Sequence, residues 1–176
     1  MRDRSTLDLA PAQVQSFPPI TRQTARVLIL GSMPGGASLR AQQYYAHPRN
    51  QFWPIVGALL GFDPASPYEV RVDALRAADV ALWDVLASCV RPGSLDSAIE
   101  QRSAVPNDFA GFLAAHPQIR RIGFNGATAE ALYTRLVRPQ LAAGPEVQHL
   151  RLPSTSPAHA ALPLAAKLRA WQVIRP

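Results

Sequence analysis

Four short apolar runs, each followed by a loop of small and polar residues, constrain the fold of this chain more than any other feature. The runs cover residues 25–30, 79–83, 120–124 and 147–152. Buried parallel strands have this pattern, because both faces of such a sheet are covered. Apolar residues at helical spacing occupy the segments between and after them, at 50–61, 127–137 and 159–174. We therefore predict an α/β protein, a three-layer α/β/α sandwich around a short, mainly parallel four-stranded sheet.

The length and composition indicate one folded domain preceded by an arm. The chain has 176 residues, of which 48% are hydrophobic and 17% charged, as in ordinary globular proteins. Residues 1–25 are polar and contain Pro11, Pro18 and Pro19, which predicts an N-terminal arm packed on the domain. No internal repeat or linker divides residues 26–176, which we predict to form a single domain.

Several kinds of site and location are excluded or disfavoured. No apolar run approaches the ~18 residues of a membrane span. The first residues, MRDRSTLDLAPAQ, lack the apolar core of a secretory signal, so we expect a cytoplasmic protein. Cys89 is the single cysteine, which excludes an internal disulfide and a site of several thiolates. We predict no metal and no cofactor, and nothing in the sequence requires more than a monomer.

The charge balance favours a polyanionic partner. Lysine and arginine total 18 against 12 acidic residues, giving a net charge of +6, and Lys167 is the only lysine. A basic chain of this kind is typical of nucleic-acid binding, and arginine suits forked contacts with phosphate. An Arg-, Ala- and Pro-rich composition from a GC-rich genome explains the same excess, so both readings stay open.

The polar loops after the apolar runs are where we expect the chemistry. In a parallel sheet of this kind, ligands bind beyond the carboxyl ends of the strands. The first loop, residues 31–38, is rich in glycine and small residues, which lets backbone N–H groups converge on an anion; taken alone, the loop is more often a tight strand-to-helix turn. Residues 44–53 carry two adjacent tyrosines and then Asn50, which could simply cap a helix. Residues 152–158 form a loop rich in hydroxyl groups that could also cap a helix.

Taken together, these three segments resemble the uracil-DNA glycosylase superfamily. The first loop is similar to its motif 1, residues 46–53 to the region that follows, and residues 152–156 to its closing loop, motif 2. The resemblance is strongest to the branch named for hypoxanthine-DNA (deoxyinosine) glycosylase and covers about residues 26–160. It implies a monofunctional DNA glycosylase of base excision repair. Such an enzyme removes deaminated bases (hypoxanthine, uracil or both, with xanthine as a further candidate) from double- or single-stranded DNA.

The sequence departs from the superfamily at two catalytic positions. Met33 stands where many members carry Asp or Asn, and Leu152 stands where uracil-specific members carry His. By resemblance to the hypoxanthine branch, catalysis is then assigned to Asn50. An amide cannot remove a proton, so Asn50 would hold and aim a water molecule onto a sugar cation after the bond breaks. Backbone N–H groups near Ser32 and Met33 would stabilise the departing base.

The remaining assignments follow from the same resemblance. Tyr45 would stack on the extruded base, and Asp84 would accept its ring N–H; the alternative for Asp84 is a capping contact with Ser88 or Arg91. We expect Asn125 to serve a turn or to cap a helix, and no large apolar side chain stands where relatives insert leucine. The predicted base-binding residues are Ser32, Met33, Tyr45, Asp84 and Leu152. The predicted DNA-binding residues are Ser154, Thr155, Ser156 and His159.

Two other functions remain open at this stage. One is a nucleoside or nucleotide hydrolase that uses the same loops on a free small molecule, and the net charge of +6 argues for a polymer instead. The other is a non-catalytic nucleic-acid-binding relative, which Met33 and Leu152 make conceivable. Because Lys167 lies late in the last predicted helix, away from the predicted loops, we expect no Schiff-base lyase activity.

Overall fold

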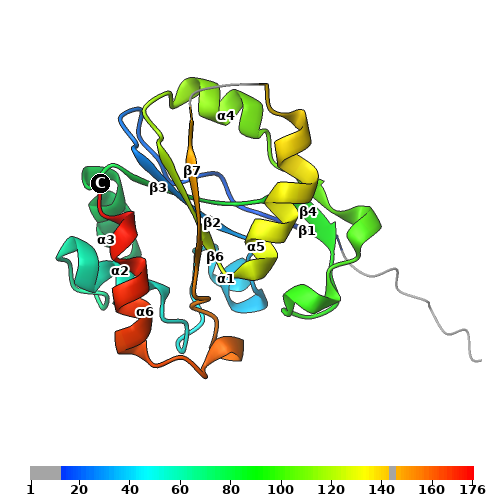
Figure 1. The fold of residues 1–176 in the computed structure, drawn as a ribbon. Coiled ribbons are helices and arrows are strands. Elements are labelled where there is room, and N and C mark those ends of the chain that lie inside the picture. Colours follow the sequence, from blue (N-terminus) through cyan, green and yellow to red (C-terminus); the bar gives the residue numbers. More distant parts are fainter. Residues whose placement is uncertain (1–12, 143–145) are drawn as a thin grey trace, which may run out of the picture.

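The computed structural model describes residues 13–142 and 146–176, and a parallel sheet forms its centre. The strand order is β3-β2-β6-β7, with all pairs parallel. The strands are β2 (Val27–Gly31), β3 (Val80–Asp84), β6 (Arg121–Asn125) and β7 (Gln148–Leu152). Each of the four predicted runs forms one of these strands. Figure 1 shows the sheet between two layers of helices, so the predicted three-layer fold is confirmed.

Side chains of β2 alternate between two apolar cores. Val27 and Ile29 face one layer, whereas Leu28 and Leu30 face the other. The first layer contains α2 (Phe52–Leu60), α3 (Tyr68–Ala77) and α6 (Leu164–Trp171). The second contains α4 (Phe109–Ala115), α5 (Ala127–Leu132) and a π-helical segment that continues α5 over Tyr133–Val137. Coverage on both faces explains why β2 and β3 are buried along their whole length, whereas the edge strand β7 is largely exposed.

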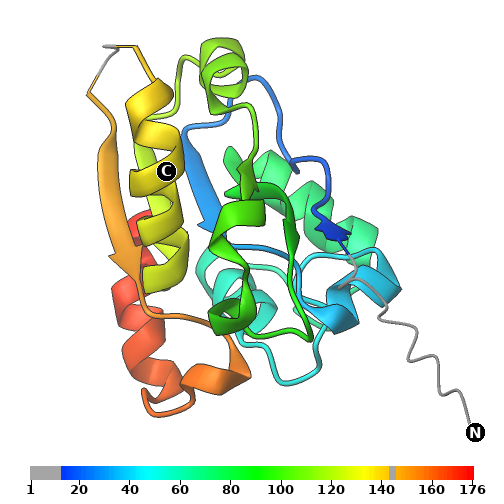
Figure 2. The ribbon, with the colours of Figure 1, turned by 90° about the vertical axis from the view of Figure 1, so that its right-hand side faces the viewer.

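A small antiparallel sheet joins the second layer and was not predicted. It consists of β1 (Gln13–Gln15), β4 (Leu86–Val90) and β5 (Val105–Pro106), in the order β1-β4-β5. Only Val85 separates β3 from β4. β1 is polar and β5 is two residues long, so neither has a recognisable hydrophobic pattern. The segment between β4 and β5 (residues 91–104) lies at the same end of the main sheet as the loop after β7 (Figure 2).

The described part of the predicted arm, residues 13–25, contacts both sheets. β1 pairs with β4, and the buried Ile20 exchanges backbone hydrogen bonds with Leu82. The predicted residues 1–12 of the arm lie outside the described residues.

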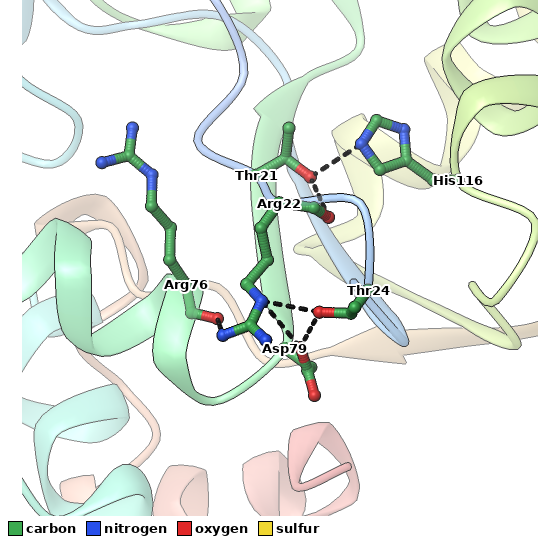
Figure 3. Close-up of polar contacts among 6 residues, drawn as sticks. All are labelled: Thr21, Arg22, Thr24, Arg76, Asp79 and His116. Carbon is green, nitrogen blue, oxygen red and sulfur yellow. Dashed lines mark hydrogen bonds and ion pairs between the residues drawn. The ribbon is translucent and has the colours of Figure 1, made fainter.

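Polar side chains join this segment to the amino end of the main sheet (Figure 3). Asp79 forms an ion pair with Arg22, at 3.2 Å, and accepts a hydrogen bond from Thr24. Thr21 Oγ1 lies 3.1 Å from Nε2 of His116, at the end of α4. We call the set the amino-end cluster; its members are Thr21, Arg22, Thr24, Arg76, Asp79 and His116.

The helices differ from the prediction in the start of the last helix and in three helices that were not predicted. The predicted helix 159–174 begins only at Leu164, because Pro163 precedes it and residues 157–159 form a separate 3-10 turn. The short α1 (Gly36–Ala41), together with α3 and α4, was not predicted. Within residues 13–142 and 146–176, every helix is too short or too polar to cross a membrane.

Candidate active site

A cavity of about 930 Å³ opens at the carboxyl ends of the strands, where the sequence predicted the site. Four segments line it, residues 31–38, 44–50, 94–97 and 154–159, together with Asp84 and Asn125 at the ends of β3 and β6. Of the predicted site residues, only Leu152 does not line this cavity. Its side chain is 3% exposed and packs in the core beside α2 and α6. The structure therefore does not bring Leu152 to the position predicted for base binding.

The first loop is held by a buried arginine and a carboxylate. The guanidinium of Arg91, 3% exposed, donates to the backbone carbonyls of Met33 and Pro34. Ser32 Oγ lies 2.7 and 2.8 Å from the two carboxylate oxygens of Asp96. Within the described residues, nothing accepts a hydrogen bond from the backbone N–H of Ser32 or Met33. Both residues line the cavity, so these two N–H groups are available to a ligand there.

Asp84 places a buried carboxyl at the end of β3. It is 3% exposed, and among the described residues its Oδ2 has no hydrogen-bond partner. The pKa of Asp84 is raised to about 8, chiefly by burial and also by the nearby Asp96, while Arg91 acts in the opposite direction. No hydrogen bond joins this carboxyl to Ser88 or Arg91 in the part of the chain that the structure describes. The geometry thus favours the ligand-facing role over the capping role.

Gly31 allows Asp84 and Tyr45 to approach the first loop. A Cβ at this position would lie 2.4 Å from Asp84 Oδ1 and 2.9 Å from the Tyr45 hydroxyl oxygen. Any side chain larger than glycine would displace these two groups. The Gly31 position and the two polar side chains therefore form one packed unit.

Tyr45 combines a stacked ring with an unpaired hydroxyl group. Its backbone φ is 54°, and its ring stacks on Phe52 with centroids 4.0 Å apart. Phe52 occupies one face of the ring, so a base can stack only on the other. The hydroxyl is buried without a partner among the described residues. Burial, together with the charge of Asp84, raises the pKa of Tyr45, so the phenol stays neutral and can donate.

Asn50 lines the cavity and also supports the start of α2. Its Oδ1 accepts a hydrogen bond of 2.9 Å from the Phe52 N–H, although the residue that caps the helix is Gln51. Asn50 therefore does accept a hydrogen bond from the first turn of α2, as the capping alternative predicted, but it does so from the position before the N-cap residue. An amide oxygen has a second lone pair. Asn50 is half-buried at the cavity wall, so that lone pair can accept from a water molecule.

Thr155 connects the closing loop to its neighbours. The Thr155 backbone N–H donates to Asn125 Oδ1 at 2.9 Å, and Asn125 Nδ2 donates to the Thr155 hydroxyl oxygen at 2.8 Å. Its carbonyl accepts from the Gln51 N–H at 3.0 Å. Thr155 is 1% exposed, so its polar groups position the loop from within. Asn125 therefore joins the end of β6 to the closing loop.

The other residues of the closing loop lie nearer to solvent. Ser154 Oγ accepts from the Ser156 N–H, and Ser156 Oγ caps the turn 157–159. His159 is exposed at the rim. Its carbonyl accepts a 2.9 Å hydrogen bond from Lys167 Nζ. The expectation that Lys167 lies away from the predicted loops is wrong, because its buried side chain extends back from α6 to this rim.

Sequence reasoning missed the contribution of residues 91–97. Asp96 and Leu95 line the cavity, and Arg91 holds the first loop, yet no predicted strand precedes this segment. Burial raises the pKa of Asp96, whereas Ser32, Arg91 and His159 lower it. Among the described residues, no cluster of three or more His, Cys, Asp or Glu side chains could hold a metal ion.

Comparisons with known proteins agree on one family. The family model described as the uracil DNA glycosylase superfamily matches residues 18–175. A Methanosarcina barkeri (strain Fusaro) protein named hypoxanthine DNA glycosylase is 38% identical over 113 residues, 64% of this chain and 70% of the relative. A protein of the same name from Methanosarcina acetivorans is 39% identical over 116 residues, which are 65% of this chain and 72% of the relative.

A solved structure is similar over nearly the whole chain. It is the solution NMR structure of a candidate uracil DNA glycosylase from Methanosarcina acetivorans, with a TM-score of 0.77 and 33% identity. The similarity covers 93% of this chain and 98% of that one.

Proposed function

The chain belongs to the uracil DNA glycosylase superfamily, and from this premise we propose that it hydrolyses the N-glycosidic bond of deaminated bases in DNA. The proposed substrates are hypoxanthine first, as the names of the two relatives suggest, then uracil and xanthine. The observation that carries the proposal is the buried Asp84 carboxyl, with an unpartnered oxygen, in the same cavity as Asn50 and the first loop. No metal or cofactor is required.

Asp84 can recognise the feature that these bases share. With a pKa near 8, the carboxyl keeps its proton at neutral pH, so it can donate one hydrogen bond and accept another. Hypoxanthine, xanthine and uracil each present a carbonyl oxygen beside a ring N–H. A neutral carboxyl pairs with both groups at once, and the Tyr45 hydroxyl adds a second donor beside it.

The proposed reaction separates bond cleavage from water attack. The electron pair of the glycosidic bond leaves with the base, whose growing negative charge is stabilised by the N–H groups of Ser32 and Met33. The sugar becomes an oxocarbenium-like cation. Asn50 Oδ1 orients a water whose oxygen then bonds to C1′, and the water releases a proton to the departing base or to solvent. Asn50 needs no basicity in this order of events, because the cation is already reactive.

The rim supplies contacts for the DNA strand. Ser154, Ser156 and His159 line the cavity next to solvent, where they can hold flanking phosphates. The net charge of +6 favours a polyanion over a free nucleoside. Lys167, the single lysine, donates to the His159 carbonyl and is not part of the cavity lining, so we propose that no lyase step follows.

An excision assay tests the proposal. Metal-free protein is incubated with labelled DNA that carries hypoxanthine, uracil or xanthine, and abasic sites are then cleaved with alkali. We expect strand breaks only after alkali, and no covalent complex with borohydride. Release from free deoxynucleosides alone would point to the small-molecule hydrolase, and binding without release would point to a non-catalytic relative.

A further inference from the structure

We propose that Leu95 is the wedge that enters the DNA duplex when a base is extruded into the cavity. The inference rests on the proposed function and extends it to a residue outside the three sequence motifs. It concerns how the enzyme reaches a base that begins inside the stack.

Extrusion leaves a gap that an apolar side chain can fill. A glycosylase acting on duplex DNA must rotate the nucleotide out, and the unstacked neighbours then lose contact area. Proteins that hold such a gap open often insert leucine, isoleucine, methionine or phenylalanine between the bases. A residue with this role must be apolar, exposed and fixed at the mouth of the cavity.

The closing loop offers no such side chain. Residues 153–159 read Pro-Ser-Thr-Ser-Pro-Ala-His, and their hydroxyl oxygens accept hydrogen bonds from backbone N–H groups of the loop or from Asn125. Leu162 follows in sequence and is 39% exposed, but it does not line the cavity. The wedge therefore has to come from another segment.

Leu95 meets all three requirements. It lines the cavity, and at 60% exposure it is the most exposed large hydrophobic side chain among the described residues. A lone exposed leucine is ordinary on a protein surface, so exposure decides nothing by itself. Its position at the mouth, between two anchored residues, sets it apart.

The neighbours of Leu95 are tied to the first loop. Ser94 Oγ accepts the Gly36 N–H at 2.9 Å, and the Asp96 carboxylate accepts from Ser32 Oγ. The carbonyl of Leu95 itself accepts the Ala98 N–H at 3.0 Å. These contacts fix the backbone on both sides, so the side chain is presented to the duplex at little further cost in conformational entropy.

The test compares two leucine variants on paired and unpaired targets. Leu95→Ala and the matched control Leu162→Ala are assayed on hypoxanthine in a paired duplex, in an unpaired bubble and in a single strand. For Leu95→Ala we expect kcat/KM to fall by about 10- to 100-fold on the duplex and less than about threefold on the unpaired targets, because only the duplex requires a gap to be filled. Leu162→Ala should match the wild type on all three.

Rescue and folding controls make the result decisive. Leu95→Met should restore most duplex excision, since it fills the gap with a similar volume. Both alanine variants should have the same melting temperature as the wild type, because the two leucine side chains are exposed. Equal losses on paired and unpaired DNA, or a duplex-specific loss in Leu162→Ala instead, would overturn the wedge. A wild type that releases no base from any of the three substrates would refute the proposed function itself.

Discussion

The two ends of the central sheet differ in whether their polar side chains have hydrogen-bond partners. At the amino end, the amino-end cluster pairs its members through hydrogen bonds and an ion pair. At the carboxyl end, two buried atoms of residues that line the cavity have no partner among the described residues: the Tyr45 hydroxyl oxygen and Asp84 Oδ2. The same sheet thus presents one end built for stability and another left open for a ligand.

This difference has an energetic meaning. A buried polar group without a partner costs about 1–3 kcal/mol relative to a paired one. The carboxyl end therefore carries a penalty that a correctly shaped base can remove by supplying the missing partners. Changes at this end should alter chemistry and pH dependence, whereas changes at the amino end should alter stability alone.

The largest effect is expected at Asn50. Asn50→Ala removes the oxygen that orients the water, and excision should slow by about 100- to 1,000-fold in single-turnover kinetics. The same change removes the acceptor of the Phe52 N–H, at a cost of about 1 kcal/mol to folding. Asn50→Ser separates the two roles, because serine can still accept from that N–H but does not extend as far into the cavity. Full activity in Asn50→Ala would remove Asn50 from the mechanism.

The next effect is a change in pH dependence at Asp84. Wild-type excision should fall about tenfold between about pH 7 and pH 9, because the carboxyl loses its donor proton as pH rises through its pKa of about 8. Asp84→Asn both donates and accepts at every pH, so it should keep its activity over this range. Ionisation of the base affects both proteins equally, and the ratio of their rates isolates Asp84. Parallel pH profiles would contradict the assignment.

The same substitution should stabilise the fold. The ordinary pKa of an aspartate, 3.8, is raised to about 8 here, so between these values the native state holds a proton that the unfolded chain releases. The free energy of unfolding therefore declines as pH rises through that window. Asp84→Asn cannot ionise, and its advantage in unfolding free energy over the wild type should grow from little near pH 4 to on the order of 5 kcal/mol at pH 8. Urea unfolding at the two pH values measures it.

The smallest effect is expected at Asp79, in the amino-end cluster. Asp79→Ala removes the ion pair with Arg22 and the hydrogen bond from Thr24, at a position whose φ is 55°. We expect a loss of about 1–2 kcal/mol in unfolding free energy, with excision within about twofold of wild type. Asp79→Asn tolerates the backbone and keeps an acceptor, so it should lose less. Impaired excision in folded Asp79→Ala would show that the amino end of the sheet affects catalysis as well as stability.

The sequence predicted the parts of the molecule that follow regular patterns. The four apolar runs predict the central strands, because a sheet covered on both faces requires continuous hydrophobic residues. The placement of Asn50, Asp84 and the first loop at one cavity then follows from parallel topology. The alternation of residues within β2 between two cores is a direct consequence of strand geometry.

Contacts between distant segments could not be predicted in this way. Leu95 and Asp96 lie at the cavity because β4 and β5 pair in a second sheet, and these strands are short or mixed in character. Leu152 is the last residue of β7, and the pleat turns it into the core. Lys167 is on α6 but extends back to His159, a direction that helical spacing alone does not reveal.

Val85 carries a consequence of its own. It is fully buried and is the one residue between β3 and β4, and its N–H donates to the Gly31 carbonyl. The chain therefore passes from Asp84 through β4 and the short non-strand segment 91–94 to Leu95. One short stretch of the chain thus carries both the carboxyl that is proposed to recognise the extruded base and the side chain that is proposed to fill the gap the base leaves in the DNA duplex.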